Sequence, residues 1–236
     1  MEKIVEVEDL NYSYPSEKSL VLNDVSFDVY ENEFFSIVGP SGCGKSTLAL
    51  ILAGLIPKSL GGKLEGKVKI NNQNIDKISQ AELAQKVQIL FQSPESQLFA
   101  LNVEDEISFG LENLNMPWKE IEKRVNETLE KLGINELRNR SIEELSSGQK
   151  QKVALASVLA MKPQILILDE PTANLDPAAV NDFLKILKEL KKETTIVLIE
   201  HNIDFVKGFS DRIMLMDEGR CLKITSPEKC LRIRSF

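Results

Sequence analysis

A glycine-rich turn that ends in Gly-Lys-Ser has the residue types and the spacing needed to bind phosphate. It lies between an apolar run at 34 to 38 and another at 48 to 53. In the pattern G-x4-G-K-S, backbone N–H groups converge on phosphate oxygens, Lys45 reaches the β and γ phosphates, and the Ser46 hydroxyl is placed to bind Mg²⁺. The helix expected to follow directs its positive N-terminal end at the same anion. The sequence therefore predicts a nucleoside triphosphate site formed by Gly39, Pro40, Ser41, Gly42, Cys43, Gly44, Lys45, Ser46 and Thr47.

An acidic pair, Asp169 and Glu170, follows a strand-like aliphatic run at 165 to 168. A carboxylate held at the end of such a strand can bind magnesium directly or through water. The adjacent glutamate can polarise an attacking water, and a general base of this kind contributes about 10² to 10⁴ to the rate. Two solvated acids at a strand end are the ordinary alternative. The aliphatic run before the pair favours Asp169 as a magnesium ligand and Glu170 as the base.

A further string, Leu145-Ser146-Ser147-Gly148-Gln149, lies between these two motifs. With it, the chain resembles the ATP-binding-cassette (ABC) ATPases over nearly its whole length. The motifs occur in the family's order, and this order makes a chance match improbable. They are an aromatic residue near the start, the phosphate-binding loop, Gln92, the signature string, Asp169-Glu170, Asn174-Leu175-Asp176 and His201.

The resemblance assigns functions to an aromatic residue and an amide. Tyr14, followed by Pro15, corresponds to the residue on which the adenine ring stacks, and stacking accepts any flat π face. Tyr12 is the competing candidate, but the family's aromatic residue directly precedes a turn, which favours Tyr14. Gln92 follows the strand-like run at 87 to 91 and taken alone would be an ordinary loop residue. The resemblance implies that its amide reaches the magnesium ion or the attacking water and reports the nucleotide state to a membrane partner.

His201 is the single histidine of the chain and follows a β-branched run at 194 to 199. A lone histidine is usually structural or exposed. By the resemblance it is the switch histidine that contacts the γ phosphate, where a neutral imidazole donates one hydrogen bond. Glu200 and Asn202 flank it, where the family commonly has a hydroxyl residue and an aspartate. The resemblance also implies that Asp176 takes part in communication between the two subunits of a dimer.

The signature string has no use within its own chain's site. In the family two cassettes pack head to tail, so the resemblance implies that Ser146, Ser147, Gly148 and Gln149 act on the ATP held by the partner. The string begins a helix, which offers N–H donors and a positive dipole end to a phosphate. A serine that caps a helix is the alternative reading. Ser147 stands where a second glycine is usual, and glycine would allow closer approach.

The fold class expected from these patterns is α/β, a P-loop NTPase with a RecA-like parallel sheet. We expect a single ABC ATPase domain over 1–236, in which 1–92 and 161–236 form an antiparallel β subdomain and the RecA-like core. Residues 93–160 are expected to form an inserted α-helical subdomain that carries the signature, because apolar residues recur at helical spacing over 118 to 132. Near-continuous apolar runs are typical of a parallel sheet covered by helices, and they occur at 34–38, 87–91, 165–169, 195–199 and 212–216. Alternating patterns predict antiparallel strands at 4–10, 26–30 and 66–70, the last within a hairpin.

Composition agrees with this assignment. The 236 residues, 42% of them hydrophobic, suffice for one sizeable core with a smaller subdomain. The net charge of −7 does not favour a nucleic-acid surface. No apolar run approaches the roughly 18 residues that span a bilayer, and no secretory signal opens the chain. The three cysteines lack disulfide or zinc spacing. These features favour a reducing cytoplasm, and the resemblance to transporter ATPases implies a peripheral protein on the cytoplasmic face of the cell membrane.

The segment Phe91-Gln92-Ser93-Pro94-Glu95-Ser96-Gln97-Leu98-Phe99-Ala100 narrows the resemblance. It is similar to the energy-coupling-factor importers, in which an N-P-x-x-Q-L-F segment precedes a groove that docks a helix of the transmembrane coupling subunit. Those systems import vitamins or transition-metal ions through separate substrate-binding membrane subunits. The resemblance thus implies an ATPase that uses ATP and Mg²⁺ and drives import. Its implied partners are a second ABC ATPase subunit, the same or different, a transmembrane coupling subunit and a substrate-binding membrane subunit.

One alternative within the family stays open, because the ATPase could serve another ABC importer or exporter. Two other classes with a phosphate-binding loop fit the sequence less well. A soluble ABC ATPase of DNA repair or chromosome organisation would normally carry a coiled coil or zinc module between the phosphate-binding loop and the signature, and no heptads or cysteine pairs lie there. A small-molecule kinase would need its own substrate site and no signature helix.

Overall fold

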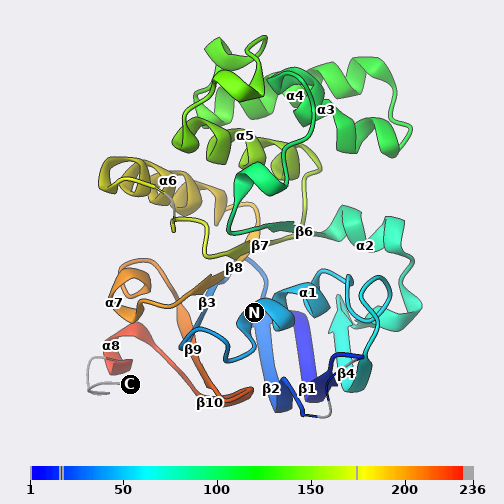
Figure 1. Cartoon of the computed structure of the whole chain (residues 1–236), viewed down its shortest axis with the longest axis vertical. Coiled ribbons are helices and arrows are strands. Elements are labelled where there is room, and N and C mark those ends of the chain that lie inside the picture. The colour runs from blue at the N-terminus through cyan, green and yellow to red at the C-terminus, as the bar shows by residue number, and fades with distance from the viewer. Residues whose placement is uncertain (1, 16, 18, 174, 231–236) are drawn as a thin grey trace.

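Two β-sheets organise the computed structural model, which describes residues 2–15, 17, 19–173 and 175–230 (Figure 1). In the larger sheet, all neighbouring strands run parallel except the edge strand that follows a tight turn. Its order is β10 (Arg220–Thr225), β9 (Arg212–Asp217), β3 (Phe34–Val38), β8 (Thr195–Glu200), β7 (Ile165–Asp169) and β6 (Val87–Leu90). The predicted parallel strands are confirmed. The antiparallel strand β10 was not predicted.

The smaller sheet is antiparallel and carries the N-terminal part of the chain. Its order is β2 (Leu22–Tyr30), β1 (Lys3–Ser13), β4 (Lys63–Ile70) and β5 (Gln73–Asn74). Asn71 and Asn72 connect β4 to β5 with positive φ angles of 50° and 61°, the conformation of a two-residue hairpin turn. The predicted strands and hairpin are confirmed, although β1 and β2 are longer than the alternating patterns indicated.

Some of the helices lie together at one end of the molecule, and others lie against the large sheet. The helix predicted over 118 to 132 is confirmed with those bounds, and it ends at Gly133 in a left-handed conformation. Figure 1 shows α3, α4 and α5 together at one end and the antiparallel sheet near the other. The α-helices are α1 (Lys45–Leu52), α2 (Gln80–Lys86), α3 (Val103–Asn113), α4 (Trp118–Leu132), α5 (Ser147–Ala160), α6 (Pro177–Leu190), α7 (Ile203–Val206) and α8 (Pro227–Cys230). None of these described helices combines the length and apolar character needed to cross a bilayer.

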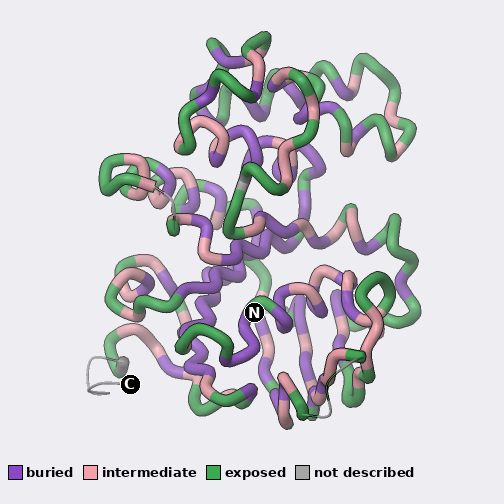
Figure 2. Tube along the Cα trace, viewed as in Figure 1, coloured by how far each residue is buried: buried purple, intermediate pink, exposed green. Residues whose placement is uncertain are grey.

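The large sheet separates two hydrophobic cores. Side chains alternate between its faces, so Leu166 and Leu168 join one core whereas Ile165 and Ile167 join the other. The first core includes α3, α4, α5 and α6, and the second holds α1 between the two sheets. Figure 2 shows the buried residues concentrated along the central strands. Burial on both faces explains why these strands read as continuous apolar runs.

The parallel arrangement brings distant motifs to one edge of the large sheet. The carboxyl ends of parallel strands lie at the same edge, where ligands bind in open α/β sheets. Gly39 follows β3, Gln92 lies just beyond β6, Asp169 ends β7 and Glu200 ends β8. Asp169 pairs in register with Ile199, the neighbour of Glu200. The fold therefore gathers most of the predicted site residues at the rim of the sheet.

Candidate functional site

The phosphate-binding loop connects β3 to α1. Glycine is required at position 39, because a Cβ there would lie 2.2 Å from the carbonyl oxygen of Met216. Gly44 precedes α1 with a φ of 101°, a left-handed conformation that glycine adopts without strain. Lys45 is only 4% exposed, and its Nζ donates hydrogen bonds to the carbonyl oxygens of Gly39 at 2.9 Å and Pro40 at 3.0 Å. The loop thus holds the amine against its own backbone beside the N-terminal end of α1.

A cleft of about 310 Å³ opens beside this loop. Gln92 Nε2 donates a hydrogen bond to Glu170 Oε2 at 3.2 Å, and Oε1 of Glu170 lies 3.9 Å from Lys45 Nζ. The structure therefore brings together three predicted residues that are far apart in the sequence. The cleft is lined by Val21, Ser41, Gly42, Gly44, Lys45, Ser46, Thr47, Gln92 and Glu170.

Val21 lines the cleft although no sequence pattern selected it. It lies just before β2, and its N–H donates to the carbonyl oxygen of Tyr12 at 2.8 Å. A Cβ on Gly44 would lie 2.9 Å from the Val21 carbonyl oxygen, so this segment rests directly on the phosphate-binding loop. Only the close packing of the antiparallel sheet against α1 places Val21 there. A lone valine in a loop carries no local signal of that contact.

The backbone of Glu170 is strained. Its φ of 45° lies in the left-handed region, which costs a residue with a side chain about 1–3 kcal/mol. The Glu170 N–H donates to the carbonyl oxygen of Ile199 at 3.0 Å, which fixes this turn to β8. The conformation turns the chain directly after Asp169 and directs the Glu170 carboxylate toward Lys45 and Gln92. Strain of this kind is typical of functional sites.

Asp169 has a buried carboxylate suited to a cation. The residue is 9% exposed, and its Oδ1 has no hydrogen-bond partner among the described residues. Burial raises the pKa of Asp169, a hydrogen bond from Ser46 opposes this shift, and the Glu170 carboxylate adds to it. An unpartnered oxygen in a carboxylate that touches Ser46 is a donor of the type that Mg²⁺ prefers. Asp169 and Ser46 therefore fit a magnesium ion, and Gln92, which lines the same cleft as Ser46, would be able to add its amide oxygen.

His201 lies on the other side of the phosphate-binding loop. It lines a cavity of about 530 Å³ that also includes Gly39 and Pro40, so it is not part of the cleft that holds Gln92. The imidazole is exposed, and its Nδ1 lies 3.7 Å from Oε2 of the buried Glu200. The structure thus places His201 beside Gly39 and Pro40 at the start of the phosphate-binding loop.

The two candidate aromatic residues have different environments. Tyr12 is fully buried and donates from its hydroxyl to the Gly61 carbonyl oxygen at 2.9 Å, so its ring belongs to the core. Tyr14 is only partly buried, and its hydroxyl lies 3.1 Å from Thr47 Oγ1. The ring of Tyr14 packs edge-on against Tyr12 at 5.0 Å. These environments favour Tyr14 as the ring that remains available for stacking.

The signature string forms the start of α5, as predicted. Ser146 caps the helix, and its hydroxyl and the Gln149 side chain form a reciprocal capping box. Both the predicted helix start and the alternative of a serine cap therefore hold. The exposed Ser147 occupies the first helical position without a positive φ, so this backbone does not require glycine. The capping box also uses the N–H groups of Ser146 and Gln149, so the N–H groups of Ser147 and Gly148 are the ones left in the first turn to meet a phosphate.

Asp176 has a local structural function. It caps α6 by accepting hydrogen bonds from the N–H groups of Ala178 at 2.9 Å and Ala179 at 3.0 Å. Pro177 at the first helical position completes a helix start that the sequence analysis did not consider. Asn174, which completes the Asn-Leu-Asp motif, lies outside the described residues.

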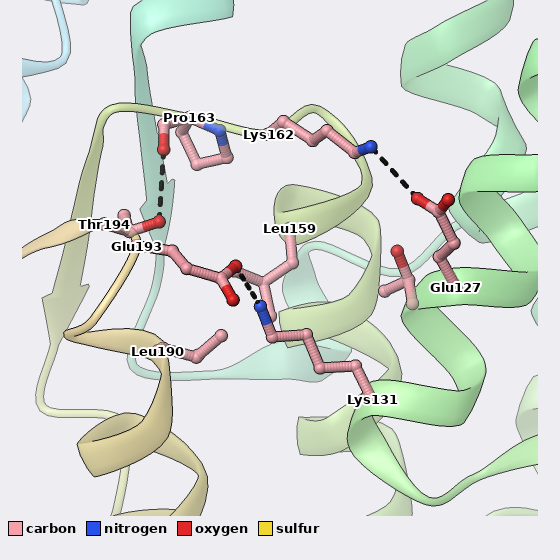
Figure 3. Close-up of a pocket in the computed structure, with 9 residues that line it drawn as sticks. Glu127, Lys131, Leu159, Lys162, Pro163, Leu190, Glu193 and Thr194 are labelled. Carbon is pink, nitrogen blue, oxygen red and sulfur yellow. Dashed lines mark hydrogen bonds and ion pairs between the residues drawn. The ribbon is translucent and has the colours of Figure 1, made fainter.

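A separate cavity of about 280 Å³ lies between α4 and the segment that follows α6 (Figure 3). Glu127 and Lys131 project from α4 and pair with Lys162 at 3.0 Å and Glu193 at 2.5 Å. Since its charged groups are paired with one another and no predicted site residue lines it, we assign no chemistry to this cavity.

Comparison with known proteins identifies the family. The family model described as ABC transporter matches residues 22–173. A putative ABC transporter ATP-binding protein of Methanosarcina mazei is 44% identical over 93% of this chain, and the chain spans 38% of that relative's length. The energy-coupling factor transporter ATP-binding protein EcfA of Methanocaldococcus jannaschii is 39% identical over 96% of this chain and 80% of the relative.

A solved structure gives the same result. The chain superimposes with a TM-score of 0.88 and 36% identity on cbiO1 from Clostridium perfringens, described as part of the ABC transporter complex cbiONQ. The superposition covers 98% of this chain and 91% of cbiO1. The predicted P-loop ABC ATPase fold is thereby confirmed.

Proposed function

The chain belongs to the ABC transporter family and is an ATPase, and we propose that it powers an importer of the energy-coupling-factor type. The observation that carries this proposal is that the phosphate-binding loop, Asp169 and Glu170 lie at one rim of the sheet in a chain that shares 39% identity with EcfA. The Gln97-Leu98-Phe99 segment supports the same subfamily. The proposed cargo is a vitamin or a metal ion, carried by a separate membrane subunit. The proposed location is the cytoplasmic face of the membrane.

We propose that hydrolysis depends on groups on both sides of the bound phosphates. The loop residues 39–47 and Lys45 bind the β and γ phosphates, and Tyr14 stacks on the base. Glu170 accepts a hydrogen bond from the attacking water and polarises it as general base. Gln92 Nε2 already donates to Glu170 Oε2 and so orients this carboxylate. His201, from the adjacent cavity, donates a hydrogen bond to the γ phosphate.

Magnesium is the proposed cofactor. Ser46, Asp169 and Gln92 would hold it, and it would neutralise charge that develops on the phosphate oxygens. The unpartnered Oδ1 of Asp169 supports this assignment. The carboxylate of Asp169 is fixed at the end of β7 by the pairing of that strand with β8 and β6.

ABC transporter ATPases work as dimers with transmembrane subunits. For this chain we propose a head-to-tail pair in which Ser146, Ser147, Gly148 and Gln149 cover the ATP of the partner and Asp176 lies at the contact between subunits. The exposure of Ser147 at the start of α5 supports this assignment. The partner is a second ABC ATPase subunit, either a copy of this chain or a related chain. The helical part at 93–160 is the proposed subdomain that moves with the signature.

An exposed apolar surface supports the proposed membrane partner. Phe99 is 61% and Leu101 84% exposed, and Phe99 packs edge-on against the exposed Phe109 with ring centroids 4.4 Å apart. The buried Glu106 accepts hydrogen bonds from the N–H groups of Phe99 and Ala100 at 3.0 and 2.9 Å, which fixes this loop on α3. We assign this surface to a helix of the transmembrane coupling subunit, since a rigidly presented apolar loop matches an apolar helix face.

The experiment that tests the hydrolytic assignment is replacement of Glu170 by Gln. The variant should bind ATP with unchanged affinity and lose about 10² to 10⁴ in turnover, because the amide cannot act as a base. Calorimetry measures binding and phosphate release measures turnover. Glu218→Gln, a change at a residue on the turn between β9 and β10, is the matched control and should leave turnover unchanged. Turnover like wild type in Glu170→Gln would remove Glu170 from the role of base.

A second experiment tests the membrane partner. Replacing both Leu98 and Phe99 with Ser should weaken copurification with the membrane subunits from detergent-solubilised membranes while ATP binding stays intact. The exposed Leu222 on β10, replaced by Ser, is the control for general loss of apolar surface. Unchanged recovery of the same membrane subunits by the doubly substituted chain would argue against this docking surface.

A further inference from the structure

Glu200 is a buried acid that the proposed hydrolytic mechanism does not use. It is the last residue of β8, 3% exposed, and directly precedes His201. A carboxylate in this position loses hydration, so burial is unfavourable unless hydrogen bonds or a cation compensate. Its surroundings therefore indicate what it does.

The two oxygens of Glu200 face two different functional segments. Oε1 accepts a hydrogen bond from Thr172 Oγ1 at 3.0 Å, and Oε2 lies 3.7 Å from His201 Nδ1. Burial raises the pKa of Glu200, whereas the Thr172 hydroxyl and the His201 ring oppose this shift. Thr172 lies two residues beyond Glu170, in the segment that leads to Asp176. One carboxylate therefore connects the chain after the proposed base with the proposed switch histidine.

The distance to His201 leaves room for a tighter contact. At 3.7 Å the two atoms are within ion-pair range but beyond hydrogen-bond range. The imidazole is exposed and able to rotate, whereas the carboxylate is fixed by burial and by Thr172. Hydrogen bonds in functional sites are often long without substrate and shorten in the reactive complex. A small rotation of the ring suffices for Nδ1–H to donate to Glu200.

We propose that Glu200 is a positioning residue for ATP hydrolysis, which holds His201 through Nδ1 and links it to Thr172. With Nδ1–H directed at the carboxylate, Nε2 is the ring nitrogen left for the γ phosphate. A carboxylate that accepts from one ring nitrogen fixes the tautomer and the orientation of a functional histidine. This inference rests on the proposed role of His201 in the site and adds a residue that acts only through it.

A double-mutant cycle tests the inference. Four forms of the full-length chain are compared for kcat and KM with Mg-ATP: wild type, Glu200→Gln, His201→Ala and the double variant. Gln keeps the size of the side chain and can accept from Thr172, but its amide presents a donor to Nδ1. Glu200→Gln should lower kcat about 10- to 100-fold with KM for ATP changed less than about twofold. In the His201→Ala background the same change should have no further effect on kcat, because a residue that acts through His201 has nothing left to position.

Two further variants separate positioning from folding. Glu33→Gln makes the same change at another buried acid, 4% exposed and paired with Arg212 away from the site, and should leave kcat unchanged. Thr172→Val removes the donor to Oε1 and should lower kcat in the same direction, again without further effect in the His201→Ala background. Thermal unfolding verifies that each variant is folded, and Thr172→Val carries the test if Glu200→Gln does not fold.

The outcomes distinguish this inference from the proposed function. Loss of turnover in Glu170→Gln, together with additive effects of Glu200→Gln and His201→Ala, would overturn the inference and leave the hydrolytic assignment intact. Unchanged turnover in His201→Ala or in Glu200→Gln would also overturn it. Wild-type turnover in Glu170→Gln would count against the proposed function instead. A non-additive pair with unchanged KM supports positioning, since a purely structural role would affect both backgrounds equally.

Discussion

Replacement of Asp169 by Asn is expected to stabilise the metal-free protein while it prevents hydrolysis. The Asp169 carboxylate is buried, its Oδ1 lacks a partner among the described residues, and the neighbouring Glu170 carries a charge of the same sign. Asparagine keeps the shape of the side chain and an oxygen for the contact with Ser46, but removes the charge. The negative charge destabilises the metal-free fold but is needed to bind a cation. Its removal should therefore raise stability and abolish hydrolysis in the same variant.

The size of the effect follows from the burial. The gain does not come from the unpartnered position, because the asparagine amide is left as unpartnered as the oxygen that it replaces. It comes from the charge, since each unit by which the pKa of a buried carboxyl is raised corresponds to about 1.4 kcal/mol of stability lost on ionisation. A net gain of about 1–2 kcal/mol corresponds to an increase in Tm of roughly 2–8 °C for a chain of this size. The pKa of Asp169 is raised in the folded state, so ionisation destabilises the fold. The advantage of the variant should therefore vanish below the unfolded pKa of about 3.9 and grow as the pH rises through the raised value.

Calorimetric unfolding in EDTA between pH 4 and 8 measures this difference. With Mg-ATP the order should reverse, because wild type gains the stabilisation of a bound ligand and the variant gains less. Asp182→Asn makes the same change at an exposed acid and should shift Tm little in either condition. A variant that melts below wild type in EDTA at pH 7 would show that the Asp169 carboxylate is well compensated in the metal-free fold, and would refute the reasoning.

Two other predictions concern the helical part of the chain. Ser147→Arg should leave ATP binding by its own chain intact and block hydrolysis of the partner's ATP, whereas Ser147→Gly should change turnover little. Single-turnover measurements on mixed dimers show which of the two ATP molecules is affected. A loss confined to the ATP bound by the substituted chain would contradict the head-to-tail arrangement. Arg138 donates hydrogen bonds to Glu104 and thereby lowers the pKa of Glu104. Glu104→Gln should therefore reduce the free energy of unfolding by about 1 kcal/mol at pH 7, and the difference should disappear as the pH falls through the lowered pKa. Urea titrations between pH 3 and 7 measure it, and a difference that persists at pH 3 would exclude the ion pair as its cause.

The sequence predicted those parts of the fold in which a local pattern and the tertiary environment agree. The run at 165 to 168 is buried on both faces, so its continuous apolar character identified β7. The helix α4 has an amphipathic pattern, a proline before it and Gly133 after it, and its bounds were predicted without error. β10 has an irregular burial pattern at the edge of the sheet, and Lys223 interrupts its apolar residues. β6 lies at the other edge of the same sheet and was predicted from its apolar run, so the weak apolar pattern of β10, and not its edge position, explains why it was missed.

The site residues also fall into those that a local sequence pattern predicts and those that only the tertiary packing reveals. Lys45, Ser46 and the rest of the loop follow each other in the chain, so one string was enough to predict them. Val21 reaches the cleft only because the antiparallel sheet packs on α1, and this contact has no local signal. Ser146 and Asp176 were selected for roles in a dimer, and the structure adds that both cap helices of their own chain. Serine and aspartate before a helix are typical capping residues, so both caps could have been predicted from the sequence. For Ser146 and Asp176 the resemblance indicated a role in the dimer instead.

The buried acids at the rim of the sheet contribute to the site at a cost to the stability of the fold. Asp169 and Glu200 end neighbouring strands, both are buried, and burial raises the pKa of each. Among the described residues neither carboxylate has a lysine or arginine at hydrogen-bond distance, and Lys45 Nζ donates to backbone oxygens instead. Both carboxylates therefore favour any arrangement that supplies a compensating group: a cation beside Asp169 and the imidazole of His201 beside Glu200. Binding of Mg-ATP would supply the first and order the second, so the same event that assembles the reaction site also relieves the unfavourable burial of both acids.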